Sequence, residues 1–410
     1  MIQSFSIENF KSFRKATLPL APLTLLIGAN ASGKSNAIEA IQLLTWLASG
    51  RPVSDLLYAV REQELSLRGG FKDLGSASGA ISLGCELIED NGQPPLSFSI
   101  SLDVTEQGLR IATERATLGP LNTKLCKTPL SEDLEVSTPP SLRTSLQDLW
   151  NQYSAILANN HSLAVALSST VFLDPDPRRM REYSFVQEKR LKRDGSALSS
   201  VLRYLTEEKK EKHRVLALIR SLPEQDISDI TYVETPRNEV MVELHETFGG
   251  RAVPREAALL SDGTLRVLAV AAALFSIPEE STLVIEEIDN GVHPSRAEKL
   301  LSDIQAIALE RNLKVLLTSH NPALLDALPL EAIPNVVACY RDPEEGDSRL
   351  IRLEELESYP ELVAQGPIGS LLTRGILDRF LKDPEKRDNA VKVEKGLAWL
   401  SDFKRRAQAS

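Results

Sequence analysis

The sequence has 410 residues, of which 42% are hydrophobic and 25% are charged, and its formal net charge is −10. A chain of this length exceeds what one hydrophobic core supports, so we expect two lobes or domains of ordinary globular composition. The negative charge argues against a protein that coats nucleic acid, although it is compatible with a local basic groove.

The cysteines and the apolar segments narrow the class of protein further. Cys85, Cys126 and Cys339 lie far apart, which excludes a four-cysteine zinc site and fits a reducing compartment. No apolar run is long enough to cross a membrane, and the N-terminus does not resemble a signal peptide. We therefore expect a soluble, cytoplasmic protein without a membrane partner.

The N-terminal part of the chain predicts strands on either side of one long helix. Residues 2–13 alternate apolar and polar side chains, as an edge or half-buried strand does. Residues 23–27 form a short buried strand, and residues 35–48 carry apolar side chains at helical spacing. Residues 80–117 contain three alternating segments separated by turn-forming residues, which predicts an antiparallel sheet.

The rest of the chain changes character twice. Residues 118–140 are polar and rich in proline, whereas residues 141–222 have the pattern of helices, which are predicted at 145–160 and 195–222. Two strands are expected between 226 and 246, and residues 262–341 then alternate helix and strand, which indicates a parallel sheet with crossover helices. We predict an α/β fold with a mixed or parallel sheet core, an antiparallel β subdomain and an inserted helical lobe.

This pattern divides the chain into four parts. An N-terminal lobe is followed by the inserted helical lobe, by the C-terminal half of the core and by a tail with a terminal helix. The core sheet is thus split in sequence, because its first strand precedes the insertion and its other strands follow it. The predicted boundaries are 1–140, 141–225, 226–345 and 346–410.

A glycine-rich turn between the first core strand and the long helix has the composition of a phosphate-binding loop. Gly28, Gly33, Lys34 and Ser35 occupy every fixed position of the pattern G-x-x-x-x-G-K-[ST]. Glycine permits a close approach of the backbone to phosphate, and the following helix directs the positive end of its dipole at the same point. We call residues 28–35 the phosphate loop and predict that it binds ATP.

The role of each residue in the loop follows from phosphate chemistry. Lys34 is expected to reach the β- and γ-phosphates, and the hydroxyl of Ser35 is expected to hold Mg²⁺. Successive backbone N–H groups from Ala31 onward can wrap a phosphate. The predicted ATP-binding residues here are Asn30, Ala31, Ser32, Gly33, Lys34, Ser35 and Asn36.

A second buried strand, Leu283–Ile285, ends in two adjacent carboxylates, Glu286 and Glu287. Such a pair is costly to bury unless a cation or a proton transfer uses it. Because successive side chains on a strand point to opposite faces, the two should have different roles. We predict that Glu286 binds Mg²⁺ and that Glu287 is the general base for the attacking water. The alternative is a strand that ends in a solvated acidic loop.

Two further segments place polar residues beside predicted core elements. Ser261 and Gly263 begin an apolar helix whose free N–H groups offer another anion site, although an ordinary helix cap explains the serine equally well. His320 follows a buried strand, close to where a γ-phosphate would lie over a parallel sheet. A lone histidine is more often an ordinary surface or core residue. A role in sensing phosphate is therefore inferred only from the order of four segments: the phosphate loop, the helix that begins with serine and glycine, the acidic strand end and the strand before the histidine.

Taken together, the segments resemble ABC-type ATPases of the RecF/SMC kind, and most closely the ATPase module of the OLD-like AAA family. The resemblance spans nearly the whole chain and implies an ABC-type P-loop ATPase head with an inserted helical lobe. The matching motifs are FSIENFKSF, the Walker A sequence GANASGKS, the signature-like LLSDGTLR, the Walker B sequence LVIEEIDNGVHP and the switch TSHNP.

In this family ATP and Mg²⁺ are clamped in a head-to-tail dimer, between the Walker A motif of one subunit and the signature of the other. The resemblance implies that Ser261 and Gly263 contact the γ-phosphate across the interface and that His320 senses it. Asp289 begins the connecting D-loop, residues 289–291, and is assigned to the nucleotide. The residues assigned to catalysis are Lys34, Glu287 and His320.

The motifs depart from the wider ABC pattern at a few positions. The signature has Asp262 and Thr264 where transporter subunits carry glycine and glutamine, and Glu286 replaces the commoner aspartate. These departures weaken an interpretation as a transporter subunit more than one as an ATPase. The Q-loop is not placed, because its expected region, residues 68–75, contains no glutamine.

Two features of the sequence suggest partners: the length of the chain after the switch motif TSHNP, and one basic stretch. OLD-like nucleases continue into a Toprim nuclease domain, for which the residues after Tyr340 are too few, so we expect a separate effector protein. Residues 178–214 carry twelve Lys or Arg against six Asp or Glu. This surplus predicts contacts with DNA phosphates, unless the charges form ion pairs on a solvated helical face.

The leading hypothesis is an ATPase whose nucleotide-linked dimer drives or gates a DNA-repair or anti-phage defence complex. One alternative is an ATP-dependent scaffold that holds a partner effector with little turnover. The other is an ABC transporter ATPase subunit, against which the long insertion and the altered signature count. The sequence does not identify the partner or the trigger.

Overall fold

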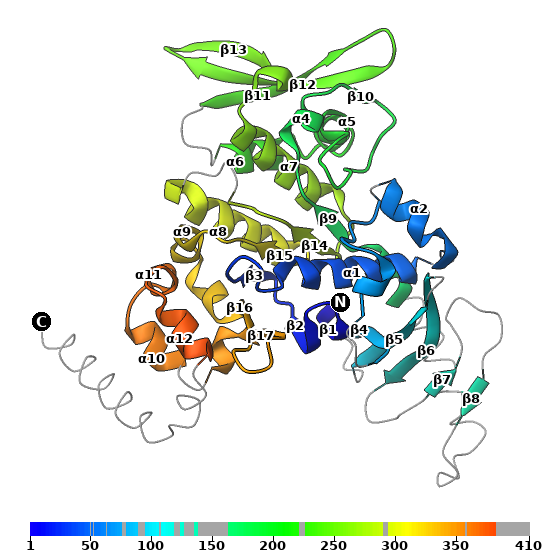
Figure 1. Ribbon diagram of the computed structural model, residues 1–410. Coiled ribbons are helices and arrows are strands. Elements are labelled where there is room, and N and C mark those ends of the chain that lie inside the picture. Colours follow the sequence, from blue (N-terminus) through cyan, green and yellow to red (C-terminus); the bar gives the residue numbers. More distant parts are fainter. Residues whose placement is uncertain are drawn as a thin grey trace, which may run out of the picture.

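The computed structural model of the protein describes residues 1–49, 51, 53–62, 64–75, 79–88, 95–105, 108–118, 124–126, 135–137, 163–220, 226–289, 294–356 and 359–382. A helix predicted at 145–160, the D-loop residues 290 and 291, and the predicted terminal helix lie outside these residues. Figure 1 shows a central sheet, an antiparallel sheet on one flank and a lobe above both.

A six-stranded sheet forms the core, in the order β17-β16-β3-β15-β14-β9. All of its strands run parallel except β17, which pairs antiparallel with β16. The sheet is therefore mixed, and the alternation of helix and strand in the sequence predicts most of it. Its strands are β3 (Leu23–Ile27), β9 (Val171–Leu173), β14 (Thr282–Ile285), β15 (Lys314–Thr318), β16 (Val336–Arg341) and β17 (Ser348–Arg352).

Both faces of the core sheet are buried, because its central strands are apolar at almost every position. Leu25 and Leu317 belong to the hydrophobic core that contains helices α7 and α8. Leu26 and Leu316, one residue along each strand, belong to a second core that contains α1. Alternate side chains of one strand thus serve two cores, as in other parallel sheets. The helices are α1 (Lys34–Ala48), α7 (Asp262–Ser276) and α8 (Pro294–Glu310).

An antiparallel sheet in the order β2-β1-β4-β5-β6 shares the second core with α1. The three strands predicted at 80–117 are confirmed as β4, β5 and β6, and β1 lies inside the sheet between β2 and β4. A separate pair, β7 and β8, is also antiparallel. The strands are β1 (Ile2–Phe10), β2 (Phe13–Pro19), β4 (Ile81–Leu87), β5 (Leu96–Thr105), β6 (Gly108–Leu118), β7 (Lys124–Cys126) and β8 (Glu135–Ser137).

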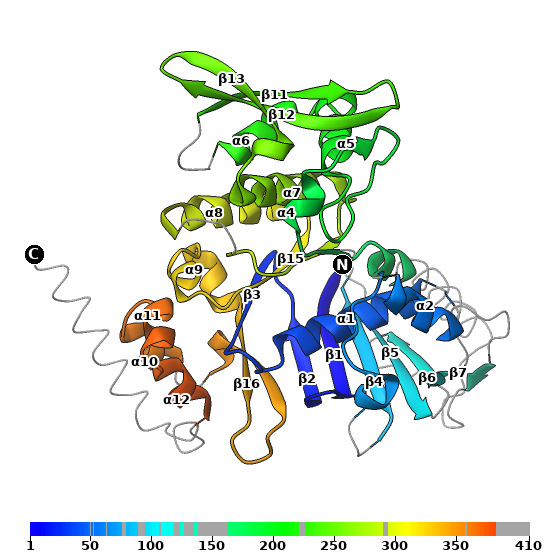
Figure 2. The ribbon, with the colours of Figure 1, turned by 45° about the horizontal axis from the view of Figure 1, so that its top comes forward.

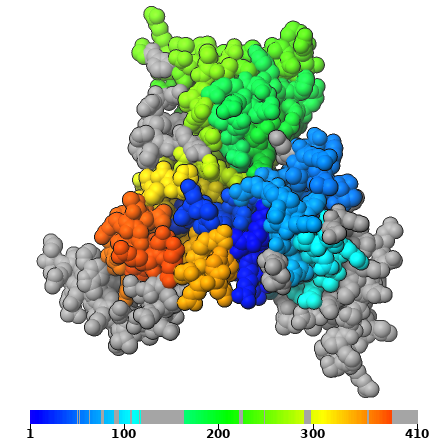
Figure 3. Space-filling model, viewed as in Figure 1, coloured from blue at the N-terminus to red at the C-terminus, as the bar shows by residue number. Residues whose placement is uncertain are grey.

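The lobe above the core sheet, green in Figure 3, is built from a small sheet over helices. Its strands are ordered β10-β12-β11, with β13 paired to β12. Ile230 and Val242 of this sheet share the first hydrophobic core with α5, α6 and α7. The elements are α4 (Pro177–Met180), β10 (Ser184–Phe185), α5 (Leu198–Arg203), α6 (Lys212–Ile219), β11 (Ile227–Glu234), β12 (Glu239–Phe248) and β13 (Arg251–Glu256).

The described part of residues 141–225 is less helical than the sequence indicates. β9 joins the edge of the core sheet and β10 joins the lobe sheet, and both are too short to show an alternating pattern. The helix predicted across 195–222 is interrupted by a π-helical turn, Tyr204–Glu208, and by the positive φ of Lys210. The boundaries of the four predicted parts remain a prediction.

The C-terminal part adds one core strand and a group of short helices. Figures 1 and 2 show these helices on one flank of the molecule and the β1–β6 sheet on the other. Within the described residues, no helix combines the length and the apolar character that crossing a bilayer requires. The remaining helices are α2 (Leu56–Arg61), α9 (Pro322–Asp326), α10 (Tyr359–Ala364), α11 (Ile368–Thr373) and α12 (Ile376–Lys382), with 3₁₀ turns at Val53–Asp55, Phe71–Asp73, Ala257–Leu259, Leu330–Asn335 and Leu353–Glu355.

Candidate nucleotide-binding site

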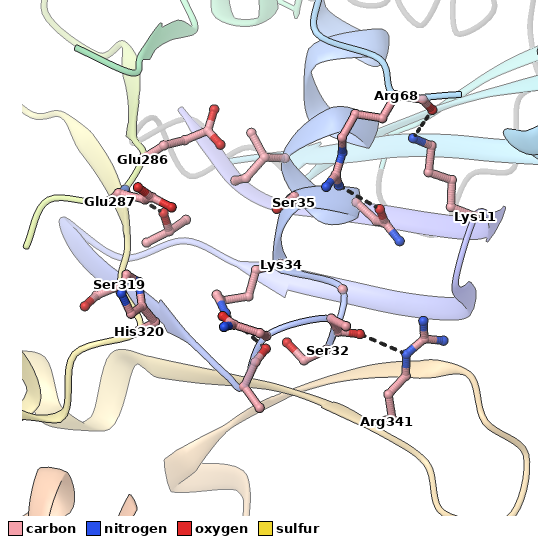
Figure 4. A pocket seen from close by; sticks show the side chains of 17 residues that line it. Lys11, Ser32, Lys34, Ser35, Arg68, Glu286, Glu287, Ser319, His320 and Arg341 are labelled. Atoms are coloured by element: carbon pink, nitrogen blue, oxygen red, sulfur yellow. Dashed lines mark hydrogen bonds between the residues drawn. The ribbon is translucent and has the colours of Figure 1, made fainter. Parts of the chain in front are cut away.

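A pocket of about 430 Å³ lies where the carboxyl ends of β3, β14 and β15 meet (Figure 4). Parallel strands place the segments that follow them at one edge of the sheet, so the phosphate loop, the two carboxylates and the histidine come together. The described residues that line the pocket are Lys11, Ala29, Asn30, Ala31, Ser32, Gly33, Lys34, Ser35, Asn36, Ile38, Arg68, Glu286, Glu287, Thr318, Ser319, His320 and Arg341.

The β16–β17 hairpin forms a floor beneath the phosphate loop. Ser348 Oγ donates to the carbonyl of Ser32 at 2.5 Å, and Cys339 Sγ donates to the same carbonyl at 3.4 Å. The loop lies so close that a Cβ on Gly28 would be 2.3 Å from the Cys339 carbonyl, and one on Gly33 would be 2.4 Å from Ser348 Oγ. Both glycines also have positive φ, so the sequence pattern reflects close backbone packing as well as phosphate chemistry.

Lys34 lies in the mouth of the phosphate loop. Its Nζ donates to the carbonyls of Gly28 at 2.5 Å and Ala29 at 3.2 Å. Burial lowers the pKa of the Lys34 ammonium, and the nearby carboxylates of Glu287 and Asp289 act in the opposite direction. The ammonium is thus oriented toward the loop, next to the free N–H groups in the first turn of α1.

Glu286 and Glu287 have different environments, although both follow the end of β14 at Ile285 and both line the pocket. Glu286 Oε1 accepts a hydrogen bond from Arg193 Nη2 at 2.7 Å. Burial raises the pKa of the Glu286 carboxyl, and Arg193 opposes that shift. Glu287 has a positive φ of 50°, and its N–H donates to Thr318 Oγ1 at 3.0 Å. Figure 4 shows both side chains at the end of the strand, across from the phosphate loop.

His320 is half exposed at the edge of the pocket, and a buried carboxylate lies behind it. Asp289 Oδ2 is 3.8 Å from His320 Nδ1, and the Asp289 side chain is only 5% exposed. The other carboxylate oxygen of Asp289 is buried without a hydrogen-bond partner in the described part of the chain. Asp289 does not line the pocket, so it is better placed to orient His320 than to contact nucleotide.

The predicted metal ligands, Ser35 and Glu286, both line the pocket. The described residues contain no group of three or more His, Cys, Asp or Glu side chains arranged to hold a metal ion. A hydroxyl and one carboxylate fit Mg²⁺, which typically keeps several water ligands and takes others from substrate phosphates. These residues would therefore hold the ion only together with a bound nucleotide.

The signature residues do not reach this pocket. Ser261 and Gly263 lie at the N-terminus of α7, and neither lines the pocket. Ser261 Oγ caps the helix by accepting from the Thr264 N–H at 3.1 Å. Arg181 Nη2 donates to the Leu260 carbonyl at 2.9 Å and to Asp262 Oδ1 at 2.6 Å, which fixes the turn before the helix.

Several cationic residues of the site have no assigned role in the sequence analysis. Lys11 and Arg68 both pair with Glu39, which is only 4% exposed on α1, and the Arg68 Nε to Glu39 Oε1 distance is 2.5 Å. Arg341 donates from Nε to the Ala31 carbonyl at 3.2 Å. Lys11 falls within the motif FSIENFKSF, Arg68 within residues 68–75 and Arg193 within the basic stretch 178–214, but no sequence signal marks Arg341.

The sequence matches a protein family described as "AAA domain, putative AbiEii toxin, Type IV TA system" over residues 23–326. It is 42% identical over 69 residues to the DNA replication and repair protein RecF of Gloeobacter violaceus, covering 17% of this chain and 16% of RecF. It is 34% identical over 104 residues to the Old nuclease of Escherichia phage P2, covering 25% of this chain and 16% of the nuclease. The chain therefore spans a small part of the length of these relatives.

In fold, the chain is similar to an SMC head domain solved with the C-winged helix domain of ScpA. The TM-score is 0.50 at 13% identity, covering 85% of this chain and 97% of the SMC head. This similarity concerns the fold alone. With the core sheet and the family match, it confirms both the resemblance to RecF, SMC and OLD proteins and the α/β, ABC-type P-loop ATPase fold.

Proposed function

Because the chain belongs to the AAA family that its residues 23–326 match, we propose that it binds ATP with Mg²⁺ in the pocket and hydrolyses it. The observation that carries this proposal is the convergence of Lys34, Glu287 and His320 on one cavity. Lys34 would bind the β- and γ-phosphates, Glu287 would accept a proton from the attacking water, and His320 would contact the γ-phosphate. Ser35 and Glu286 would hold the metal ion, which neutralises phosphate charge when bound.

We propose further that two copies associate head to tail around the nucleotide. Ser261 is exposed and Gly263 is partly exposed, and neither lines the pocket of its own chain. A helix N-terminus with free N–H groups suits the γ-phosphate of a partner subunit. Asp289 would link the two halves by orienting His320 beside the interface.

The dimer would drive or gate a DNA-repair or anti-phage defence complex in the cytoplasm, with a separate effector protein. The family description names a putative toxin of a type IV toxin–antitoxin system, and RecF is named for DNA replication and repair. The SMC head similar in fold was solved with a bound domain of another protein, ScpA. These descriptions support a partner-dependent role.

Replacing Glu287 by Gln tests hydrolysis and dimerisation together. We expect turnover to fall roughly 10²- to 10⁴-fold, because the general base is lost, while ATP and Mg²⁺ still produce a dimer in light scattering. Lys34→Ala is the matched control, since it should lose the dimer as well. The proposal is wrong if the wild-type protein neither retains nucleotide nor changes its association state with ATP and Mg²⁺.

A second candidate is an ATP-dependent scaffold with little turnover, and the Arg193–Glu286 pair favours it. While the pair holds, one oxygen of the metal-binding carboxylate is engaged, so Mg²⁺ must compete with a guanidinium. The same experiment separates the candidates. A scaffold would form ATP-dependent dimers with the wild-type chain, and its already negligible turnover would not change in Glu287→Gln.

We also propose that residues 178–214 bind DNA, through fewer side chains than the sequence suggests. Eight of the twelve basic residues form ion pairs with carboxylates. In the described chain, those without such a pair are Arg178, Arg190, Lys209 and Lys210. Reversing these four charges should weaken DNA binding and reduce its dependence on salt. An affinity that is insensitive to salt would exclude this contact.

A further inference from the structure

Arg341 brings a guanidinium to the rim of the pocket from an element outside the family motifs. β16 runs parallel to β3 and pairs Ala338 with Ile27, so its last residues continue alongside the phosphate loop. Arg341 Nε donates to the Ala31 carbonyl at 3.2 Å, and its Nη1 donates to the Gly346 carbonyl at 2.7 Å. Two backbone carbonyls on different segments thus fix the plane of the guanidinium.

The charge of Arg341 is not balanced by a carboxylate within the described residues, unlike the charges of Lys11, Arg68 and Arg349. Lys11 and Arg68 share the buried Glu39. Arg349, on the other strand of the same hairpin, pairs with Asp342, Glu345 and Asp347. Arg341 is nevertheless exposed, so a planar cation is held at the rim with one edge and its faces available.

The position of Arg341 identifies the part of the nucleotide that it can meet. Figure 4 places Arg341 on the far side of the phosphate loop from Glu287 and His320, which mark the γ-phosphate end. A triphosphate that follows the loop leaves its nucleoside at the opposite end of the pocket. His320 carries the only ring among the described pocket-lining residues, and it lies at the γ-phosphate end, so no ring of that set lies at the nucleoside end.

We infer that Arg341 is the stacking platform for the nucleotide base. A guanidinium plane stacks on flat π systems, whereas the compact ammonium of lysine does not. This inference rests on the proposed nucleotide binding and extends it by assigning a residue to the nucleoside. Stacking does not read the edges of the base, so Arg341 would contribute affinity without strong selection among bases.

The experiment compares the dissociation constants of ADP and inorganic tripolyphosphate by calorimetry, for the wild-type protein and for Arg341→Ala and Arg341→Lys. We expect both substitutions to weaken ADP binding about tenfold and to leave tripolyphosphate within about twofold. Arg14→Ala is the matched control, because Arg14 is an exposed arginine that pairs with Glu345 of the same hairpin and does not line the pocket.

Equal losses for both ligands would overturn the inference, because they would mean that Arg341 contacts phosphate or shapes the loop through Ala31. Full ADP affinity in Arg341→Lys would overturn stacking in favour of simple charge, and full affinity in Arg341→Ala would remove any role. If the wild-type protein binds neither ligand, the proposed nucleotide site itself fails. That result differs from an unaffected Arg341 variant in a protein that does bind.

Discussion

The pocket and the N-terminus of α7 are two phosphate-binding candidates that the protein builds in opposite ways. The pocket draws on three neighbouring strand ends and is supported from below by the β16–β17 hairpin. At the α7 N-terminus, Ser261 and Asp262 are exposed, Ser261 caps the helix and Arg181 donates to the Leu260 carbonyl. The comparison sets a site enclosed by several strands against a surface at one helix end, and we propose that the second serves another copy of the chain.

The strongest test of the pocket is Lys34→Ala. Loss of the ammonium that faces the phosphate loop should reduce ATP turnover roughly 10²- to 10³-fold, measured by phosphate release. The matched control is Lys15→Ala, whose exposed side chain pairs with Glu8 away from the pocket. Equal turnover in both variants would remove Lys34 from the site.

Ser261→Asp tests the other region without disturbing its helix. Aspartate caps a helix as well as serine does, so thermal stability should be unchanged. Its carboxylate would repel an incoming γ-phosphate, which should weaken ATP-dependent dimerisation about 10- to 100-fold in sedimentation measurements. ATP binding by the monomer should persist.

Ser261→Asn is the neutral control for this change, since asparagine also caps and adds no charge. Dimerisation should be largely retained in this variant. If Ser261→Asp dimerises as well as Ser261→Asn, the α7 N-terminus is not part of the nucleotide interface and the comparison of the two regions loses its functional meaning.

Gly28→Ala tests how the β16–β17 hairpin supports the phosphate loop beneath the pocket. A Cβ at this position would be 2.3 Å from the Cys339 carbonyl, so either the loop or β16 must move. We expect a loss of about 1–3 kcal/mol in the free energy of unfolding, with weaker binding of ADP in calorimetry. Gly250→Ala is a useful control, because Gly250 also has positive φ but has open space around it. Similar effects in the two variants would point to backbone strain instead of the hairpin floor.

Glu114→Gln probes the flanking sheet, outside both regions, and its effect depends on pH. Burial raises the pKa of the Glu114 carboxyl from its ordinary value of 4.5 to about 7. The folded state therefore holds a proton that the unfolded state releases, and the stability of the wild type should fall as the pH rises from 4.5 to 7.

The variant has no ionisable group at this position, so its advantage over the wild type should grow across that range and level off above it. The expected gain is on the order of 2 to 3 kcal/mol, measured by denaturant unfolding. A difference between the two proteins that does not change with pH would contradict the buried, protonated state of Glu114.

Sequence reasoning succeeded where a local pattern carries the structural information. The parallel strands are apolar at almost every position, and the polar residues after them meet at one sheet edge by geometry. It was less successful between residues 141 and 225, because β9 and β10 have three and two residues and show no periodicity. The basic stretch is an intermediate case. Its charge surplus is evident in the sequence, but the ion pairs that offset most of it depend on strands and helices far along the chain, such as Arg214 with Glu310.

The sequence by itself predicted the phosphate loop, the carboxylate pair after a buried strand and the parallel core sheet, because each depends on neighbouring residues and on fixed backbone periodicity. The tertiary structure alone decided which groups support them. Cys339 and Ser348 lie 307 and 316 positions from Ser32, and their contacts exist only because β16 pairs with β3. Only the fold likewise shows that Arg193 pairs with Glu286 and that Arg341 lines the pocket.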